Sequence, residues 1–223
     1  MVKAIEEIYT YGLYRHFAHL TRDNPDIDRL LIDMPVGLSE KGCIRTLDQE
    51  LRRHLKGRTS TVFNTPCRAA VYAENQEQAK KENLQLEGKS LSIQSLSLCP
   101  KIKEIDEYLR TNNDPIDIWE SHPELCFTHL SSDHKTISVS KHDQAGRQLR
   151  LDLLASHDQS ITTAYETILR NTRRKHVKSD DILDALCLCL VNTLAARAGF
   201  SFLQSPPLCD PQGIDMKIAF FRA

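Results

Sequence analysis

The spacing of apolar residues predicts a chain that is mostly helical. Apolar side chains recur at three- to five-residue intervals over residues 2–21, which predicts a first helix that ends before Pro25. Similar spacing predicts helices over 44–55, 67–85, 91–111 (broken near Cys99-Pro100), 144–156 and 161–173, and a short helix opened by Ser121-His122-Pro123-Glu124. The last helix is predicted from Ser179 to about Ala198, because Gly199 is a typical C-terminal stop.

Short apolar runs bounded by turn residues predict strands over 29–33, 116–120 and 214–221. Typical sheets contain about five or six strands, so the sheet is expected to be either abbreviated or incompletely predicted. No internal repeat, low-complexity tract or clear linker interrupts the chain. The pattern predicts a single α/β domain over residues 1–223.

Composition and charge then narrow the classes of protein. The 223 residues carry 29 Lys and Arg against 30 Asp and Glu, and 40% are hydrophobic. A net charge of −1 excludes a generally basic nucleic-acid coat and an acidic tail protein, so any polyanion must meet a local basic patch. The hydrophobic and charged fractions are ordinary for a globular domain and argue against intrinsic disorder.

Sequence features also give an expectation for localisation. No apolar run reaches the roughly 18 residues needed to cross a bilayer, and the acidic N-terminus is unlike a secretory signal. The seven cysteines are odd in number, and no two have C-x-x-C spacing. Cys187 and Cys189 are expected to be core residues, because two positions apart on a helix they face different ways. We expect a cytoplasmic protein without a membrane segment.

The strongest candidate site is the acidic start of the last predicted helix. Asp181 and Asp184 are three residues apart and share a helix face, whereas Asp180 and Asp184 are four apart. Like charges at the second spacing cost about a few tenths of a kcal/mol unless something neutralises them, as a divalent cation would. Acids in a first turn also complement the helix dipole, which explains Asp180 and Asp181 without a ligand. Asp184 lies a full turn inside the helix, which favours a metal or catalytic role.

Two predicted strands end in a carboxylate, Asp33 and Glu120. Ligands of open α/β sheets bind at the carboxyl ends of strands, although Asp33 is equally explained as the start of a turn. His122 and Glu124 follow Glu120 and have the chemistry to move protons or bind metal, but Pro123 followed by Glu is also an ordinary helix start.

Gathered carboxylates repel each other unless a hard cation joins them, so the acidic residues predict Mg²⁺ or Mn²⁺. Such sites typically serve attack on a phosphodiester. Basic residues over 45–58 with Arg68, and a second cluster of Lys141, Arg147 and Arg150, have the charge that phosphates need, although charge runs are usually solvated helix faces. The segment Gly57-Arg58-Thr59-Ser60 lacks the Lys of a P-loop, which excludes an ATPase of that type.

Five motifs occur in the order found in one known family. They are Ile32-Asp33-Met34-Pro35-Val36-Gly37-Leu38; Gly57-Arg58-Thr59-Ser60-Thr61-Val62-Phe63 with Pro66 and Arg68; Pro100-Lys101-Ile102 with Glu104-Ile105-Asp106; Glu120 with His122-Pro123-Glu124 and Phe127; and Asp180-Asp181 with Leu183-Asp184-Ala185-Leu186. Over roughly residues 26–221 the chain resembles the DUF429 family, which is described as predicted nucleases with a ribonuclease H-like fold.

The resemblance implies a mixed sheet flanked by helices and a metal site. Asp33, Asp181 and Asp184 would hold Mg²⁺ or Mn²⁺, and Glu120 would be a ligand or the proton acceptor for the attacking water. The substrate phosphates are expected to bind Arg58, Arg68, Lys141 and Arg147. The family opens with a strand that carries an Asp and with a hairpin. Residue 1 is expected at the helix after that hairpin, so the domain is expected to lack the usual N-terminal strands.

Three functions remain open at this point. The first is a metal-dependent nuclease that cleaves RNA or DNA by a two-metal carboxylate mechanism. The second is a catalytically silent member that binds nucleic acid or protein and fills a missing sheet edge by forming a homodimer. The third, a nucleotide-handling enzyme of other chemistry, shares the acidic cluster but lacks a Gly-rich phosphate loop.

Overall fold

The computed structural model describes residues 1–5, 8–112, 116–204 and 208–223. Its internal contacts divide the chain into two compact units. Unit 1 comprises Met1–Tyr14, Ser121–Ser201 and Ala219–Ala223, and unit 2 comprises Arg15–Glu120 and Phe202–Ile218. The single domain predicted over residues 1–223 stays a prediction.

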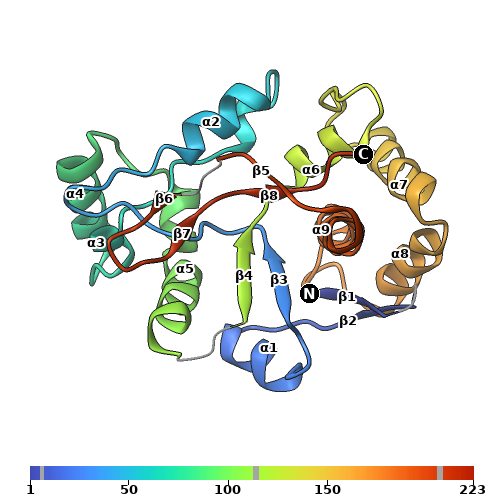
Figure 1. Ribbon diagram of the computed structural model, residues 1–223, viewed down its shortest axis with the longest axis horizontal. Helices are drawn as coiled ribbons and strands as arrows, with labels where there is room; N and C mark the ends of the chain where they lie inside the picture. Colours follow the sequence, from blue (N-terminus) through green and yellow to red (C-terminus); the bar gives the residue numbers. More distant parts are fainter. Residues whose placement is uncertain (6–7, 113–115, 205–207) are drawn as a thin grey trace. The chain divides into compact units, whose positions relative to one another are not determined.

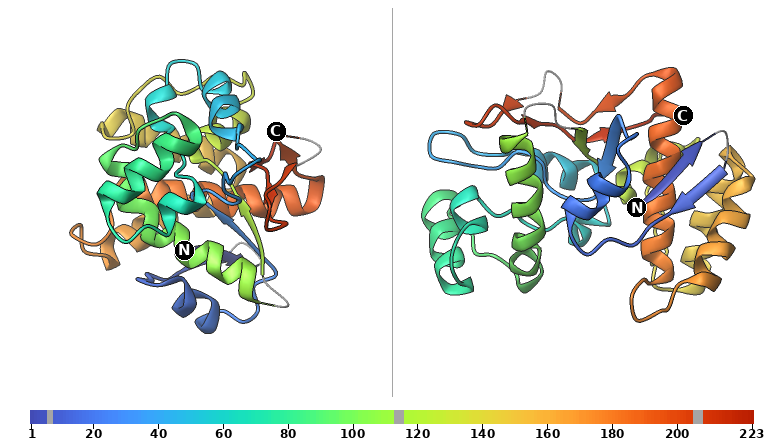
Figure 2. Two further views of the ribbon diagram at one scale, coloured as in Figure 1. Left: turned by 90° about the vertical axis from the view of Figure 1, so that its left-hand side faces the viewer. Right: turned by 90° about the horizontal axis from the view of Figure 1, so that it is seen from below.

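Unit 1 is built around one long helix. Its elements are β1 (Val2–Ile5), β2 (Ile8–Tyr11), α6 (Pro123–Leu130), α7 (Gln144–His157), α8 (Ser160–Asn171), α9 (Ser179–Ala198) and β8 (Ala219–Phe220). Figure 1 looks down the axis of α9, and the helix contacts α6, α7, α8 and β1. The second view in Figure 2 shows α9 from the side.

The sequence of α9 explains its central position. Its apolar residues occupy every face, and nine of its side chains are buried, from Asp180 to Ala195. A helix that is apolar all round gains most by burial on all sides. It begins at Ser179 and ends at Ala198, as predicted, and Gly199 follows with a φ of 103°, a conformation that favours glycine.

The predicted helix over 2–21 is wrong. Residues 2–11 contain two antiparallel strands, with Val2 opposite Tyr11 and Ile5 opposite Ile8, and residues 6–7 lie outside the described residues. β1 contacts α9 and β2 contacts α8, so packing outweighs the local apolar spacing. The chain therefore does have N-terminal strands before its first helix, contrary to the expectation that these would be missing.

Unit 2 contains the remaining elements. They are α1 (Phe17–Asp23), β3 (Arg29–Ile32), α2 (Leu47–His54), the 3₁₀ turn η1 (Thr59–Thr61), α3 (Arg68–Val71), α4 (Gln76–Glu87), α5 (Ile93–Thr111), β4 (Asp117–Glu120), β6 (Leu208–Cys209) and β7 (Asp215–Met216). The short strand β5 (Ser201–Phe202) spans the junction of the two units in the chain.

The predicted strands over 29–33 and 116–120 are confirmed as the parallel pair β3 and β4 (Figure 1). In their register Ile32 lies opposite Glu120, so both strands end at the same edge. Glu120 also forms a parallel bridge with Ile218. Apolar residues of α1 and α5 pack with Ile118 and its neighbours, so these helices cover the pair.

Several boundaries differ from the prediction. The helix predicted over 67–85 is divided into α3 and α4, because Asn75 begins α4 by accepting the N–H of Gln78. The helix over 91–111 is not broken: α5 continues through Pro100. The strand predicted over 214–221 is two short strands, β7 and β8.

Buried ion pairs hold the loops of unit 2. Arg68 at the start of α3 donates to Asp106 of α5 over 2.9 Å and to Asp210 over 2.5 Å, and it also pairs with Glu40. Asp210 accepts the backbone N–H of Leu38 as well. One guanidinium thus joins segments that are far apart in the sequence. Desolvation lowers the pKa of Arg68, but the hydrogen bonds and charges of Asp106 and Asp210 outweigh that effect and raise it.

The described residues form a mixed α/β structure with short two-stranded pairings, and the ribonuclease H-like arrangement stays a prediction. No helix among the described residues has the length and apolar character needed to cross a membrane. All seven cysteines are free in this part of the chain.

We expect Arg68→Met to destabilise unit 2 by about 3–5 kcal/mol, because it leaves buried carboxylates without a counter-charge. The only Trp of the chain, Trp119, lies in β4, so its fluorescence reports on this unit during urea unfolding. Arg110→Met is the matched control: Arg110 also meets Asp106, at 3.5 Å, but is far more exposed. Its cost should stay below about 1 kcal/mol, and equal losses in the two variants would contradict the structural role of Arg68.

Candidate functional site

The acidic start of α9 faces the α6–α7 loop (residues 131–143). Lys141 Nζ lies 2.6 Å from Asp184 Oδ2, and His142 Nδ1 lies 3.2 Å from Asp180 Oδ2. The two carboxylate side chains are only 13% and 10% exposed, whereas His142 is 72% exposed. Two acids one turn apart therefore both contact side chains of one loop, and the predicted residues Lys141 and Asp184 do meet.

Asp181 has a different environment from the one predicted. It is exposed, and its Oδ2 accepts the backbone N–H of Lys178 over 3.0 Å. This satisfies one of the donors that a helix leaves open at its start. The carboxylates that face the loop are thus Asp180 and Asp184, and a metal-binding role for Asp181 stays a prediction.

Two arginines of α7 hold the α6–α7 loop in place. Arg147 Nη1 donates to the carbonyl of His142 over 2.5 Å. Arg150 is fully buried, donates to the carbonyl of Val139 over 3.1 Å, and forms a two-pronged ion pair with Glu124 at 2.7 and 2.9 Å. Arg147 therefore positions the loop in this structure, and its predicted contact with a phosphate remains untested.

Glycine is required where this loop meets α7. A Cβ at Gly146 would lie 2.0 Å from the carbonyl oxygen of Ser140 and 3.1 Å from that of Val139. Real atoms do not approach so closely, so any side chain at this position displaces the backbone that precedes Lys141.

In unit 2 the two strand-end carboxylates differ. Asp33, just after β3, is exposed. Glu120, at the end of β4, is buried and accepts two hydrogen bonds from Arg45 Nη2 at 2.6 and 2.7 Å and one from the N–H of Val36 at 2.9 Å. Burial raises the pKa of Glu120 to about 7, although the charge of Arg45 acts in the opposite direction.

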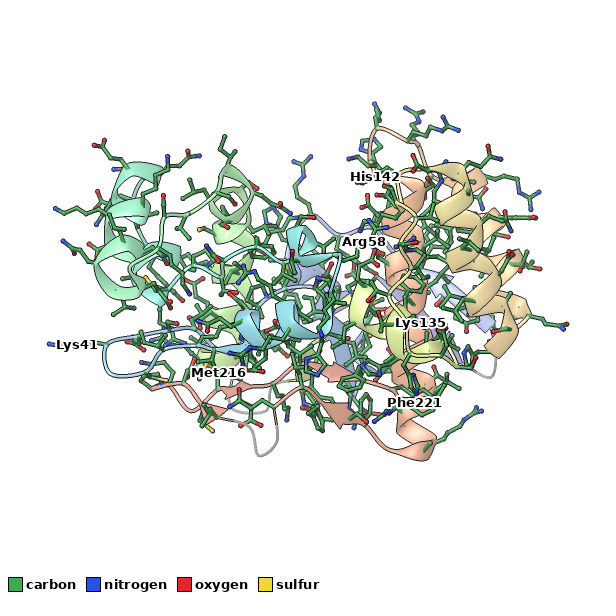
Figure 3. The ribbon with its side chains drawn as sticks, turned by 90° about the horizontal axis from the view of Figure 1, so that it is seen from above. Lys41, Arg58, Lys135, His142, Met216 and Phe221 are labelled. Carbon is green, nitrogen blue, oxygen red and sulfur yellow. The ribbon has the colours of Figure 1, made fainter. Side chains whose placement is uncertain are left out.

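The two arginines predicted to bind phosphate in this unit also differ. The guanidinium of Arg68 is buried among Asp106, Asp210 and Glu40, so a phosphate would compete with three carboxylates for its donors. Arg58 (labelled in Figure 3) is half-buried and directly precedes η1, where its carbonyl accepts the hydroxyl of Thr61 over 2.7 Å.

The residues predicted as metal ligands belong to different units: Asp33 to unit 2, and Asp181 and Asp184 to unit 1. Within the ranges that the structure describes, no three His, Cys, Asp or Glu side chains gather as a metal site. Oxygen ligands suit Mg²⁺, which commonly binds through one or two carboxylates together with water and substrate phosphate. Asp180 and Asp184 fit that mode, and they do not form a complete protein cage.

Sequence reasoning missed three features of this site. Asp180, not Asp181, lies on the loop-facing side of α9 together with Asp184. The four-residue spacing of Asp180 and Asp184 was the sequence signal that could have identified this pair. His142 was missed because nothing in the local pattern links it to α9. The run Arg173-Arg174-Lys175-His176, which lies just before α9, is recognisable from its charge alone but is absent from the predicted phosphate-binding residues.

We expect Gly146→Ala to lower the free energy of unfolding by about 1–3 kcal/mol, because the new methyl group overlaps the loop backbone. Loss of the far-ultraviolet circular dichroism signal during urea unfolding measures this change. Gln148→Ala, at an exposed position of the same helix, is the control and should change stability by less than about 0.5 kcal/mol. A stable Gly146→Ala variant would contradict the close approach of the loop.

The raised pKa of Glu120 predicts a pH dependence. Between the ordinary value of 4.5 and about 7 the folded protein keeps a proton that the unfolded chain has released, so stability falls as pH rises through this window. We expect wild type to lose about 1–3 kcal/mol more than Glu120→Gln between pH 5 and 7.5, measured by urea unfolding with Trp119 fluorescence. Parallel profiles would show that Glu120 is ionised throughout this range.

Comparisons with known proteins place the chain in a family. Residues 4–206 match the family described as "Protein of unknown function (DUF429)". Searches of curated proteins and of solved structures found no match. Because the match spans most of the 223 residues, the chain belongs to the DUF429 family.

Proposed function

We propose that the start of α9 and the facing α6–α7 loop form the active site of a metal-dependent nuclease. The observation that carries this proposal is the pair of Asp180 and Asp184, which are mostly buried, lie one turn apart and contact His142 and Lys141 of a loop. The resemblance of five ordered motifs to predicted nucleases supports the choice of a phosphodiester substrate.

Charge compensation supports a site that accepts a cation together with a phosphate. Lys141 Nζ lies 2.6 Å from Asp184 and supplies the positive charge that this carboxylate needs in the absence of a metal. Lysine is a flexible point charge, so it can leave Asp184 and contact a substrate phosphate oxygen instead. A divalent cation held by Asp180 and Asp184 would supply charge at the phosphodiester and acidify a bound water.

The other residues of the site have supporting roles in this proposal. His142 is mostly exposed next to Asp180, and an imidazole there can take up or release a proton during hydrolysis. Arg147 fixes the loop carbonyl of His142 and so orients Lys141 and His142 toward α9. Asp33 and Glu120, which belong to unit 2, remain predicted participants on which this proposal does not depend.

Nucleic-acid binding without catalysis is the second candidate function. It is favoured by the ion pair of Lys141 with Asp184, since a carboxylate that is already neutralised has less need of a cation. The absence of a three-ligand group from the described ranges favours it as well.

A cleavage assay separates the two functions. In Mn²⁺ we expect wild type to cut at least one of labelled RNA, single-stranded DNA and branched DNA, and Asp184→Asn to lose more than about 100-fold in rate. Asp181→Asn is the matched control, because its amide oxygen can still accept the N–H of Lys178, and it should stay within a few-fold of wild type.

Metal binding gives a readout that is independent of activity. Lys141→Met removes the charge that competes for Asp184, so we expect it to bind Mn²⁺ more tightly than wild type in titration calorimetry without substrate. If neither wild type nor any variant cleaves, and Lys141→Met does not bind Mn²⁺, the nuclease proposal is overturned and the binding function is left. Equal cleavage by wild type and Asp184→Asn would indicate a contaminant.

A further inference from the structure

We infer that the loop between α8 and α9 (residues 172–178, the basic loop) is a surface that binds the phosphate backbone of nucleic acid. This inference deepens the proposed function, on which the choice of nucleic acid as the partner rests. The surface was not among the predicted phosphate-binding residues. Figure 3 shows the loop in pale orange beside the labelled His142, with nitrogen-tipped side chains that extend away from the helices.

The charge of the basic loop is concentrated and uncompensated. Arg173, Arg174, Lys175 and Lys178 are all exposed, and no acidic residue occurs between Glu166 and Asp180. Within the described part of the chain, the side chains of Arg173, Arg174 and Lys175 form no ion pair.

The acidic residues that follow the loop are engaged elsewhere. Asp181 accepts the backbone N–H of Lys178, Asp180 meets His142, and Asp184 meets Lys141. The carboxylates closest in sequence therefore do not neutralise Arg173, Arg174 or Lys175, and these cations are available to an external polyanion.

Hydrogen bonds order the backbone of the loop. The carbonyl of Arg173 accepts the N–H groups of His176 over 2.8 Å and Val177 over 3.3 Å, which closes a turn. Thr172 ends α8 by donating to the carbonyl of Ile168 through its N–H and its hydroxyl. A loop that is already ordered loses less conformational entropy on binding.

The composition of the loop selects the class of partner. It contains no Phe, Tyr or Trp on which bases could stack and no Asn or Gln to read adenine, and its cations match the charge of the phosphates, so we expect binding to depend more on phosphates than on sequence. A membrane surface fits less well, because Val177 is the one aliphatic residue of the loop and is half-buried. The shared chemistry is the phosphodiester backbone, of RNA or of DNA.

The position of the loop relates it to the candidate active site. It leads directly into α9, whose first turns carry Asp180 and Asp184, and Lys141 lies at the same helix end. A strand bound along Arg173 to Lys178 would therefore run toward the acidic pair. The basic loop acts in binding, and Asp184 acts in cleavage.

The test measures fluorescence anisotropy of labelled single-stranded RNA, single-stranded DNA and duplex DNA in EDTA, with Asp184→Asn as the background so that no cleavage interferes. We expect Arg173→Gln/Arg174→Gln/Lys175→Gln to weaken binding by tenfold or more at about 0.1 M salt. The slope of log affinity against log salt should fall by about 2.7 for duplex DNA or about 2.1 for single strands, as expected for three lost phosphate contacts.

The matched control is Lys80→Gln/Lys81→Gln/Lys101→Gln, which removes three exposed positive charges from unit 2. It should bind as the background protein does. Equal loss in both triple variants, no loss in the loop variant, or no binding by the background protein would each overturn the inference. Equal loop-dependent binding to phosphatidylserine vesicles or to a poly-glutamate peptide would overturn nucleic acid as the partner.

This design separates the inference from the proposed function. Loop-dependent binding without Mn²⁺-dependent cleavage by wild type would retain the surface and overturn the nuclease. Cleavage that depends on Asp184 but is unaffected in rate and in KM by the loop variant would retain the nuclease and overturn the surface.

Discussion

The burial of α9 is the constraint on which unit 1 depends. The helix is apolar on every face, so α6, α7, α8 and β1 must all cover it. Burial also extends to its polar start, where Asp180 and Asp184 are mostly removed from solvent. A carboxylate in that position needs a compensating charge, and the chain supplies it from the α6–α7 loop rather than from α9. The candidate site is thus a consequence of how completely the helix is enclosed.

In unit 2 the buried carboxylates are compensated by arginine instead of lysine. Arg68 and Arg45 bind their carboxylates with several donors at once, and both guanidinium groups are buried. Such pairs are rigid and geometrically defined, which suits a structural role. Lys141 reaches Asp184 through one ammonium group, at a partly exposed position. The different chemistry of the two cations is one reason why the proposed active site is at Asp184 and why Arg68 is regarded as structural.

The sequence predicts those parts of the fold that depend on local pattern. The bounds of α9 and the strands ending near Asp33 and Glu120 follow from apolar runs and from terminating residues. The N-terminal hairpin could not be predicted in this way, because Ile5 and Ile8 also have helical spacing and their pairing depends on contacts of β1 and β2 with α9 and α8. The break predicted at Pro100 is also wrong, because α5 continues past this residue.

The candidate site shows a similar limit. Its acids are recognisable from their spacing, but their partners are not, because Lys141 and His142 are about forty residues away in the sequence and only folding brings them to α9. The same partners determine what the adjoining basic loop can do. If Asp180 and Asp184 formed ion pairs with Arg173 and Arg174 instead, the net charge of each pair would be zero. Neither the acids nor the arginines would then attract a charged ligand. Because the carboxylates are satisfied by the α6–α7 loop, the cations of the basic loop remain exposed to solvent. Contact of the carboxylates with a different loop, which leaves the neighbouring cations unpaired among the described residues, is therefore the physical condition that permits a phosphate-binding surface directly beside an acidic site.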